Sequence, residues 1–140
     1  MKIIHYDLKP NNIMFHEGKI KILDFGLCKQ IDSEHSNISL TNPGMGTYWY
    51  LAPETFYENH PMITSKVDVW ATGIIYYELL YGQKPFGHNM SQQNIVKNKI
   101  ILNASTVNFP EDPSLEISES AKNFIRECLM YDPNDRLNPE

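Results

Sequence analysis

The fold is decided by the stretch His5-Tyr6-Asp7-Leu8-Lys9-Pro10-Asn11-Asn12, which holds an acid, two basic side chains and two amides close together. Asp7, Lys9 and Asn12 are spaced so that a turning backbone would direct all three side chains into one cleft. Pro10 favours such a turn, because its ring fixes φ and it has no N–H to donate. We therefore expect a loop that carries chemistry.

A second carboxylate follows in Asp24-Phe25-Gly26. Between the two motifs, residues 13–15 and 19–23 are short β-type runs, and Gly18 lies where a tight turn is needed. We expect a small hairpin that carries Asp24 at its end. Because charged and apolar residues alternate over residues 19–22, one face of the hairpin should pack inward while the lysines face water.

The rest of the chain is predicted to be helical after a long polar loop over residues 26–47, whose length favours a functional role. Ser, Thr and Gly residues at the appropriate places predict the helix ends. The expected helical segments are a short turn opening at Ala52-Pro53-Glu54, a helix from the cap at 64–66 to Tyr81, one from Ser91 to about Ile100, and one from Ser118 to Leu129. The predicted fold class is mainly α, with one hairpin followed by four helical segments.

The helix ending at Tyr81 carries apolar residues on several sides, among them Trp70, Ile74 and Leu79. No single narrow stripe can hold them, so this helix should be buried and central. Asp68 within it then needs a partner, because a buried carboxylate is costly unless it is hydrogen-bonded.

The composition excludes several classes of function. A net charge of -5 and a pI near 5.5 argue against direct nucleic-acid binding, which normally needs a basic patch. The apolar run over residues 70–80 is too short and too polar to cross a bilayer, and no signal-peptide core follows Lys2. Two isolated cysteines, Cys28 and Cys128, are typical of a reducing intracellular compartment, and neither is expected to be catalytic.

An ordered set of motifs resembles the protein kinase family. Any one of these short motifs is weak alone, but their order along the chain matches the family. They are His-x-Asp-Leu-Lys-Pro-x-Asn from His5, Asp-Phe-Gly from Asp24, Gly-Thr-x-x-Tyr-x-Ala-Pro-Glu from Gly46, Asp-Val-Trp-x-x-Gly from Asp68, and a late Asp-Arg at Asp135.

The resemblance implies ATP and Mg²⁺ as cofactors and gives the motif residues roles in phosphoryl transfer. Asp7 would accept the proton of the substrate hydroxyl or orient it, and Lys9 would neutralise the γ-phosphate. Asn12 and Asp24 would hold the metal. Thr47 would hydrogen-bond Asp7 and Lys9, unless it is an ordinary loop threonine.

Other motif residues are expected to be structural or to contact the nucleotide. By resemblance, His5 and Phe25 pack beneath the site, Asp68 ties the helix to the backbone of the loop, and Glu54 pairs with Arg136 in the interior. Met14 and Ile75 resemble positions that stack under adenine, and a place in the plain core is equally compatible with them.

A narrower resemblance is to the Tousled-like serine/threonine kinases. It rests on residues 46–51, on residues 84–93 and on His5-Tyr6-Asp7. It implies a nuclear kinase that acts on histone chaperones in chromatin assembly and forms oligomers through an upstream coiled coil that is not in this chain. Many kinases place arginine where Tyr6 stands, so a grip on a phosphorylated loop through that residue should be absent.

The glycine-rich loop and the Val-Ala-x-Lys strand of the nucleotide-binding lobe do not occur in the sequence. Residues 1–140 are therefore predicted to be the C-terminal lobe of a kinase domain, truncated at both ends and inactive alone. The alternative is a non-catalytic, pseudokinase-like or dominant-negative binding module. Regulatory hydroxyls in the polar loop would be Ser33, Ser36, Ser39 and Thr41, each of which is otherwise simply solvated.

Overall fold

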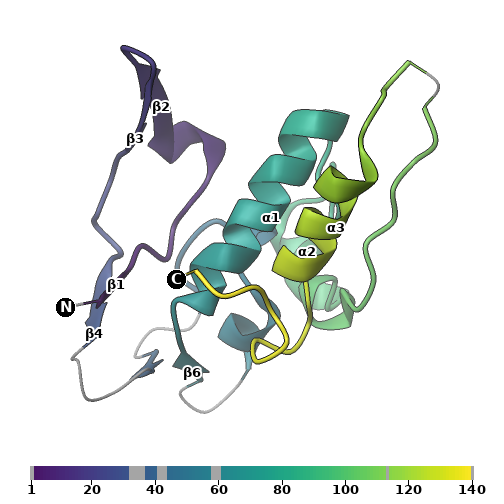
Figure 1. Cartoon of the computed structure of the whole chain (residues 1–140). Helices are drawn as coiled ribbons and strands as arrows, with labels where there is room; N and C mark the ends of the chain where they lie inside the picture. Colours follow the sequence, from purple (N-terminus) through teal and green to yellow (C-terminus); the bar gives the residue numbers. More distant parts are fainter. Residues whose placement is uncertain (1, 32–36, 41–43, 58–60, 113, 140) are drawn as a thin grey trace.

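The computed structural model describes residues 2–31, 37–40, 44–57, 61–112 and 114–139 (Figure 1). Within these ranges three α-helices form the body, and three two-stranded antiparallel sheets and short 3-10 turns accompany them. The elements are β1 (Lys2–Ile4), η1 (Pro10–Asn12), β2 (Ile13–His16), β3 (Lys19–Ile22), β4 (Lys29–Ile31), β5 (Ile38–Ser39), η2 (Tyr48–Tyr50), η3 (Pro53–Phe56), β6 (Met62–Ile63), α1 (Lys66–Tyr81), α2 (Gln92–Lys97), η4 (Ile101–Asn103) and α3 (Glu119–Cys128).

Helix α1 is central, as the sequence predicts, and α3 packs along it (Figure 1). Trp70 and Ile74 are completely buried. Gly73 allows the close approach of the two helices, because a Cβ at this position would lie 2.6 Å from the Cβ of Cys128. Gly82 ends α1 in the left-handed conformation with φ of 66°. Leu79 departs from the prediction, since it is 72% exposed near the end of the helix.

The two later helices begin at the predicted caps. The hydroxyl of Ser91 accepts a hydrogen bond from the backbone N–H of Asn94, and that of Ser118 accepts one from the N–H of Ala121. Each satisfies a donor that the first helical turn leaves without an intrahelical partner. Helix α2 is shorter than predicted, because it stops at Lys97 and the chain continues into η4.

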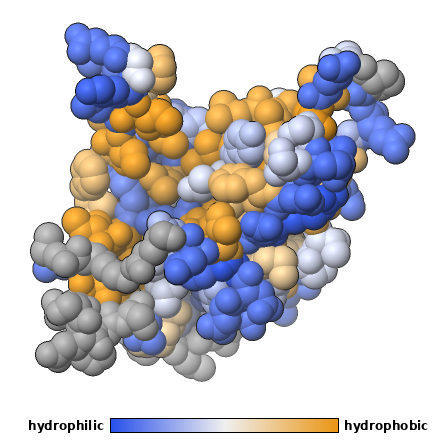
Figure 2. Space-filling view, in the orientation of Figure 1, coloured by the Kyte–Doolittle hydropathy of each residue, from blue (hydrophilic) through white to orange (hydrophobic). Residues whose placement is uncertain are grey.

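The predicted hairpin is present as β2 and β3, and Ile13 pairs with Ile22. Glu17 and Gly18 form its turn with φ of 50° and 73°, the left-handed values that a two-residue hairpin turn requires. The prediction that one face packs inward is wrong. Every residue of β3 is exposed, including Ile20 at 69%, because α1 lies opposite this face across an open groove and does not pack against it. Figure 2 shows apolar side chains gathered at the hairpin and on the adjoining body.

The prediction of a single hairpin is also wrong, since two further strand pairs lie among the described residues. Strand β1 pairs with β4, and β5 pairs with β6. Both β4 and β5 belong to the segment predicted to be a long loop. Neither pair has a tight turn in the sequence to announce it, because each joins segments that are distant along the chain.

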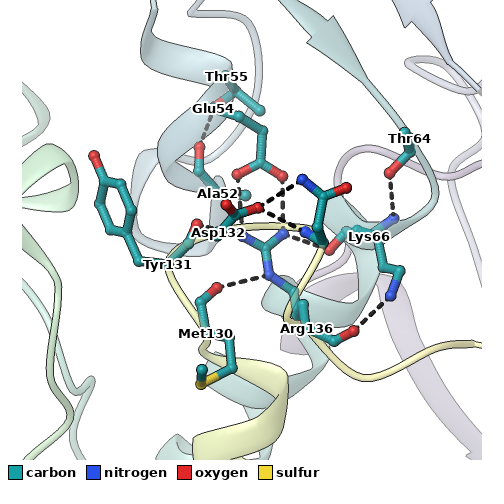
Figure 3. A network of polar contacts seen from close by, with 10 residues as sticks. Ala52, Glu54, Thr55, Thr64, Lys66, Met130, Tyr131, Asp132 and Arg136 are labelled. Carbon is teal, nitrogen blue, oxygen red and sulfur yellow. Dashed lines mark hydrogen bonds and ion pairs between the residues drawn. The ribbon is translucent and has the colours of Figure 1, made fainter.

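A buried ion pair joins the third 3-10 turn to the C-terminal segment, as predicted (Figure 3). The guanidinium of Arg136 donates to both carboxylate oxygens of Glu54, at 2.8 and 3.1 Å. It also donates to the backbone carbonyls of Lys66, Met130 and Tyr131. The charge is therefore surrounded by acceptors, which is what a buried guanidinium needs.

Among the described residues, no helix is long and apolar enough to cross a membrane.

Candidate active site

The carboxylate of Asp7 lies at the centre of a polar cluster formed by the loop that follows β1. Its Oδ2 accepts a hydrogen bond from Lys9 Nζ at 2.7 Å, and its Oδ1 accepts one from Thr47 Oγ1 at 2.9 Å. Lys9 Nζ also donates to Thr47 Oγ1 at 3.0 Å. The predicted contacts of Thr47 with Asp7 and Lys9 are thus confirmed, across 40 and 38 positions of sequence.

The His5 ring connects this loop to the segment before Asp24 through two hydrogen bonds. Its Nδ1 accepts the backbone N–H of Asp7 at 3.3 Å, so its other ring nitrogen must carry the proton that is donated to the carbonyl of Leu23 at 3.1 Å. The neutral imidazole therefore links the loop to the segment that precedes Asp24. His5 is buried, as a packed support should be.

Asp68 on α1 holds the same loop by its backbone. The carboxylate accepts the N–H of His5 at 2.7 Å and that of Tyr6 at 2.9 Å, which supplies the partner that the sequence demands. Burial raises the pKa of the Asp68 carboxyl, and the two N–H groups oppose that rise. With these bonds Tyr6 adopts a φ of 70°, an uncommon value for a tyrosine, and its side chain is buried in the core.

Asn12 and Asp24 provide the oxygen atoms that could hold a metal. The Asn12 Nδ2 donates to the carbonyl of Asp7 at 2.9 Å, so the amide oxygen is directed elsewhere. The carbonyl of Asn12 accepts the N–H of Leu23 at 2.8 Å, which brings Asp24 to the same end of the hairpin. The carboxylate of Asp24 is exposed and accepts one hydrogen bond, from the N–H of Gly26. Amide and carboxylate oxygens are the donors that Mg²⁺ prefers, so these residues fit it.

The two residues predicted to contact the nucleotide differ in solvent exposure. Met14 is exposed on β2, and Ile75 is buried on α1. Ile75 lines an apolar groove of about 370 Å³ between the hairpin, α1 and α3, together with Leu8, Pro10, Ile13, Ile20, Ile22, Thr72, Tyr76, Leu79 and Phe124. Phe25 differs from its prediction as a packed support: it is 62% exposed, although its ring contacts His5 with centroids 5.4 Å apart.

The remaining sequence-based candidates are hydroxyls and thiols. Ser33, Ser36 and Thr41 lie outside the described residues, and Ser39 is an exposed residue of β5. Cys28 and Cys128 are free thiols. Burial raises the pKa of both, to about 11 for Cys128, which fits the prediction that neither is a nucleophile.

Sequence reasoning missed a second polar cluster that borders the first, formed by Tyr50, Glu78 and Lys84. The one available signal was Glu78 itself, a charged residue inside an apolar helix. Its partners come from a separate segment and from the loop after α1, so spacing alone could not identify them.

Comparison with known proteins places this geometry in context. The family model of the protein kinase domain matches residues 1–140. The chain is 50% identical to human serine/threonine-protein kinase tousled-like 2, over 96% of this chain and 18% of the human protein. It is 49% identical to serine/threonine-protein kinase TOUSLED of Arabidopsis thaliana, over 96% of this chain and 20% of that protein. The chain therefore spans about a fifth of the length of these curated relatives.

Proposed function

This chain belongs to the protein kinase family, with Tousled-like serine/threonine kinases among its relatives, and we propose on that premise that it carries the catalytic loop of such a kinase. The reaction would move the γ-phosphoryl group of ATP to a serine or threonine of a protein. The observation that carries the proposal is the cluster in which Thr47 and Lys9 both contact the Asp7 carboxylate.

In this proposal Asp7 receives or orients the acceptor hydroxyl. An ionised carboxylate only accepts hydrogen bonds. Its Oδ2 accepts from both Lys9 and Asn12, whereas Oδ1 keeps acceptor capacity beyond the bond from Thr47. These bonds fix the orientation of the carboxylate, and fixed groups cost no reorganisation at the moment of reaction. The Lys9 ammonium, 2.7 Å from Asp7, provides positive charge beside the position where phosphoryl oxygens would arrive.

Asn12 and Asp24 would hold Mg²⁺ through the oxygen atoms described above. When bound, that ion supplies charge neutralisation of the phosphate oxygens. The chain's own contribution is to fix the two donors. Asn12 is buried and bonded to the backbone of Asp7, and the pairing of β2 with β3 positions Asp24.

We further propose that residues 1–140 are the C-terminal lobe of the kinase domain and that another part of the domain covers the hairpin face. Phe15, Ile20 and Leu79 support this, because each is about 70% exposed or more. Ile20 and Leu79 line one apolar groove, and Phe15 is the cross-strand partner of Ile20. A contiguous apolar face of this kind normally marks an interaction site. Met14, which pairs with Lys21 on the other face of the hairpin, would contact adenine from that face.

The activity is tested by phosphoryl transfer from labelled ATP to a serine-containing protein, using the longest natural polypeptide that carries this chain. Asp7→Asn should lower kcat by about 10²- to 10⁴-fold, because it removes the proton acceptor. The control is Asp135→Asn, an exposed change near the C-terminal end that should leave the rate unchanged. An Asp7→Asn protein with the parent rate would contradict the proposal.

The isolated 140-residue chain is proposed to be inactive, because its sequence holds neither the glycine-rich loop nor the lysine strand that contact the phosphates in kinases. Loss of even one group that stabilises transition-state charge costs about 10²- to 10³-fold in rate. If the isolated chain turned over substrate and Asp24→Asn abolished that turnover, the proposed inactivity would be wrong, but the proposed kinase function would stand.

The exposed apolar groove also favours a second candidate, a non-catalytic binding module. The genomic sequence upstream of Met1 separates the two, because a glycine-rich loop and lysine strand there would favour the enzyme.

The cellular role is proposed on resemblance only. It is a nuclear kinase that phosphorylates histone chaperones and forms oligomers through a coiled coil outside this chain. Phosphorylation of a purified histone chaperone in the assay above, with and without Asp7→Asn, tests the substrate. Microscopy of the tagged full-length protein tests the location.

A further inference from the structure

A pocket of about 320 Å³ lies between the last residue of α1, the segments over residues 109–112 and 115–117, and the start of α3. We call it the α1–α3 pocket. It shares no residue with the cluster around Asp7. Its wall is mostly aromatic and aliphatic, and three charged side chains line it as well. A mainly apolar pocket of this size with a few polar groups is typical of a site for a small molecule.

Tyr81 and Phe109 provide the aromatic part of this wall, with ring centroids 6.0 Å apart. Both rings are supported by residues that do not line the pocket. Tyr77 stacks on Tyr81 with centroids 4.5 Å apart, and the guanidinium of Arg126 lies 4.8 Å from the centre of the Phe109 ring. Because the face of an aromatic ring is negative, the position of Arg126 indicates that this cluster of rings attracts cations.

Two exposed carboxylates, those of Glu111 and Asp112, also line the α1–α3 pocket. Asp112 is fixed by Ser114, whose backbone N–H and hydroxyl donate to Oδ1 at 2.8 and 2.6 Å. Both bonds lower the pKa of the Asp112 carboxyl, the hydroxyl more than the N–H, so the group is ionised at neutral pH. Since both bonds go to Oδ1, they leave Oδ2 as an acceptor for a ligand.

The third charged side chain of the pocket, Lys122, already has a carboxylate partner. Its Nζ lies 3.1 Å from one oxygen of Glu119, and the guanidinium of Arg126 lies 3.4 Å from the other. The charged groups in and beside the pocket are therefore three carboxylates, of Glu111, Asp112 and Glu119, and two cations. This excess of negative charge attracts a cation and repels an anion.

We propose that the α1–α3 pocket binds a small organic cation, an ammonium group that carries an aromatic body. The ammonium would contact the carboxylates of Glu111 and Asp112, and the body would contact Phe109, Leu115 and Ile117. Charge-assisted hydrogen bonds and the negative ring faces favour the ammonium, whereas burial against the apolar wall favours the body. The proposal does not rest on the proposed function, because the pocket uses no group of the candidate active site.

Phenethylammonium is the probe for this site, and phenethyl alcohol and hydrocinnamate are its uncharged and anionic counterparts. Each compound is titrated into the 140-residue chain at neutral pH, and binding is followed by the NMR signals of the backbone amides of Glu111, Asp112 and Lys122. The ammonium should bind at least about fivefold more tightly than the alcohol, and the anion should bind most weakly. No binding, or equal binding of the ammonium and the alcohol, would overturn the proposal.

Glu111→Gln combined with Asp112→Asn should remove the preference for the ammonium over the alcohol. The double variant keeps the shape of both side chains, and asparagine retains an oxygen that can accept from Ser114. The matched control is Glu116→Gln combined with Asp135→Asn, which removes the same two charges from exposed residues outside the pocket and should keep the preference. An equal loss in both double variants would assign the preference to the net charge of the chain and overturn the proposal.

A measurement on the unaltered chain covers the case in which a variant fails to fold. Nuclear Overhauser contacts from the ring protons of bound phenethylammonium should reach the methyl groups of Leu115 and Ile117. Contacts to Ile20 and Ile22 instead would place the compound in the apolar groove beside the hairpin, and the proposal would fall. None of these measurements uses ATP, so a failure of phosphoryl transfer and a failure of the cation site are distinguishable.

Discussion

The body around α1 and the β2–β3 hairpin use the same residue types with opposite results. Ile74 on α1 is 0% exposed, whereas Ile20 on β3 is 69% exposed, and both belong to regular elements that formed as predicted. The difference lies in what faces them. Helix α3 packs against α1, while the face of the hairpin that holds Ile20 borders an open groove. Local patterning thus forms an element, but only a partner buries it.

Charged groups show the same contrast. The Arg136 side chain is fully buried and meets Glu54 and three carbonyls, whereas His16 and Glu17 at the hairpin turn are 3.7 Å apart and mostly exposed. An exposed pair contributes little, because water and salt screen it. A buried pair whose partner is removed leaves an uncompensated charge. The two regions should therefore respond very differently to the same substitution.

The largest expected effect follows from breaking the buried pair. Glu54→Ala should lower the free energy of unfolding by about 3 to 5 kcal/mol, because Arg136 keeps its charge without a carboxylate. Glu17→Ala on the hairpin is the matched control and should change it by less than about 1 kcal/mol. Urea denaturation followed by circular dichroism measures both. Equal effects would show that burial does not distinguish the two regions.

The isoleucine pair gives the next largest difference. Ile74→Ala should cost about 2 to 5 kcal/mol of unfolding free energy, since it leaves a cavity in the core. Ile20→Ala should cost about 0.5 kcal/mol or less, because its side chain is already mostly in water. The same denaturation measurement applies. A large cost for Ile20→Ala would indicate that another copy or segment covers the hairpin in solution.

The smallest expected effect is on the pH dependence of stability, which compares the buried Cys128 with the partly buried Cys28. Burial raises the pKa of Cys128 to about 11 from an ordinary 9.0, so the folded chain holds this proton more tightly than the unfolded chain. Its contribution to stability is therefore complete below about pH 9 and is lost as the pH rises through about 11. Stability measured across this window should fall less steeply in Cys128→Ala than in the parent.

Cys28→Ala is the control for that measurement, because Cys28 is only partly buried. Its pKa is raised in the same direction, by burial first and then by Asp68 and Asp24. We expect the Cys28→Ala chain to keep most of the alkaline slope. If Cys28→Ala removed more of the slope than Cys128→Ala, the assignment of the effect to the buried thiol would be wrong.

The sequence by itself determined the features that depend on neighbours along the chain. The caps at Ser91 and Ser118, the stop at Gly82 and the turn at Glu17-Gly18 are each set within a few residues, so their signals are local. The spacing of Asp7, Lys9 and Asn12 within one loop is local in the same way. For this reason the order and type of the main elements, and the grouping of Asp7, Lys9 and Asn12 in one loop, could be predicted.

Only the tertiary structure decided what those elements meet. Asp68 reaches His5 across 63 positions, and Arg136 reaches Glu54 across 82, contacts that could be expected from a family pattern but not from spacing. The pairing of β1 with β4, the exposure of Ile20 and the capture of Lys84 by Glu78 had no local signal. Burial and pairing depend on which distant segment lies opposite, and a residue's near neighbours in sequence do not contain that information.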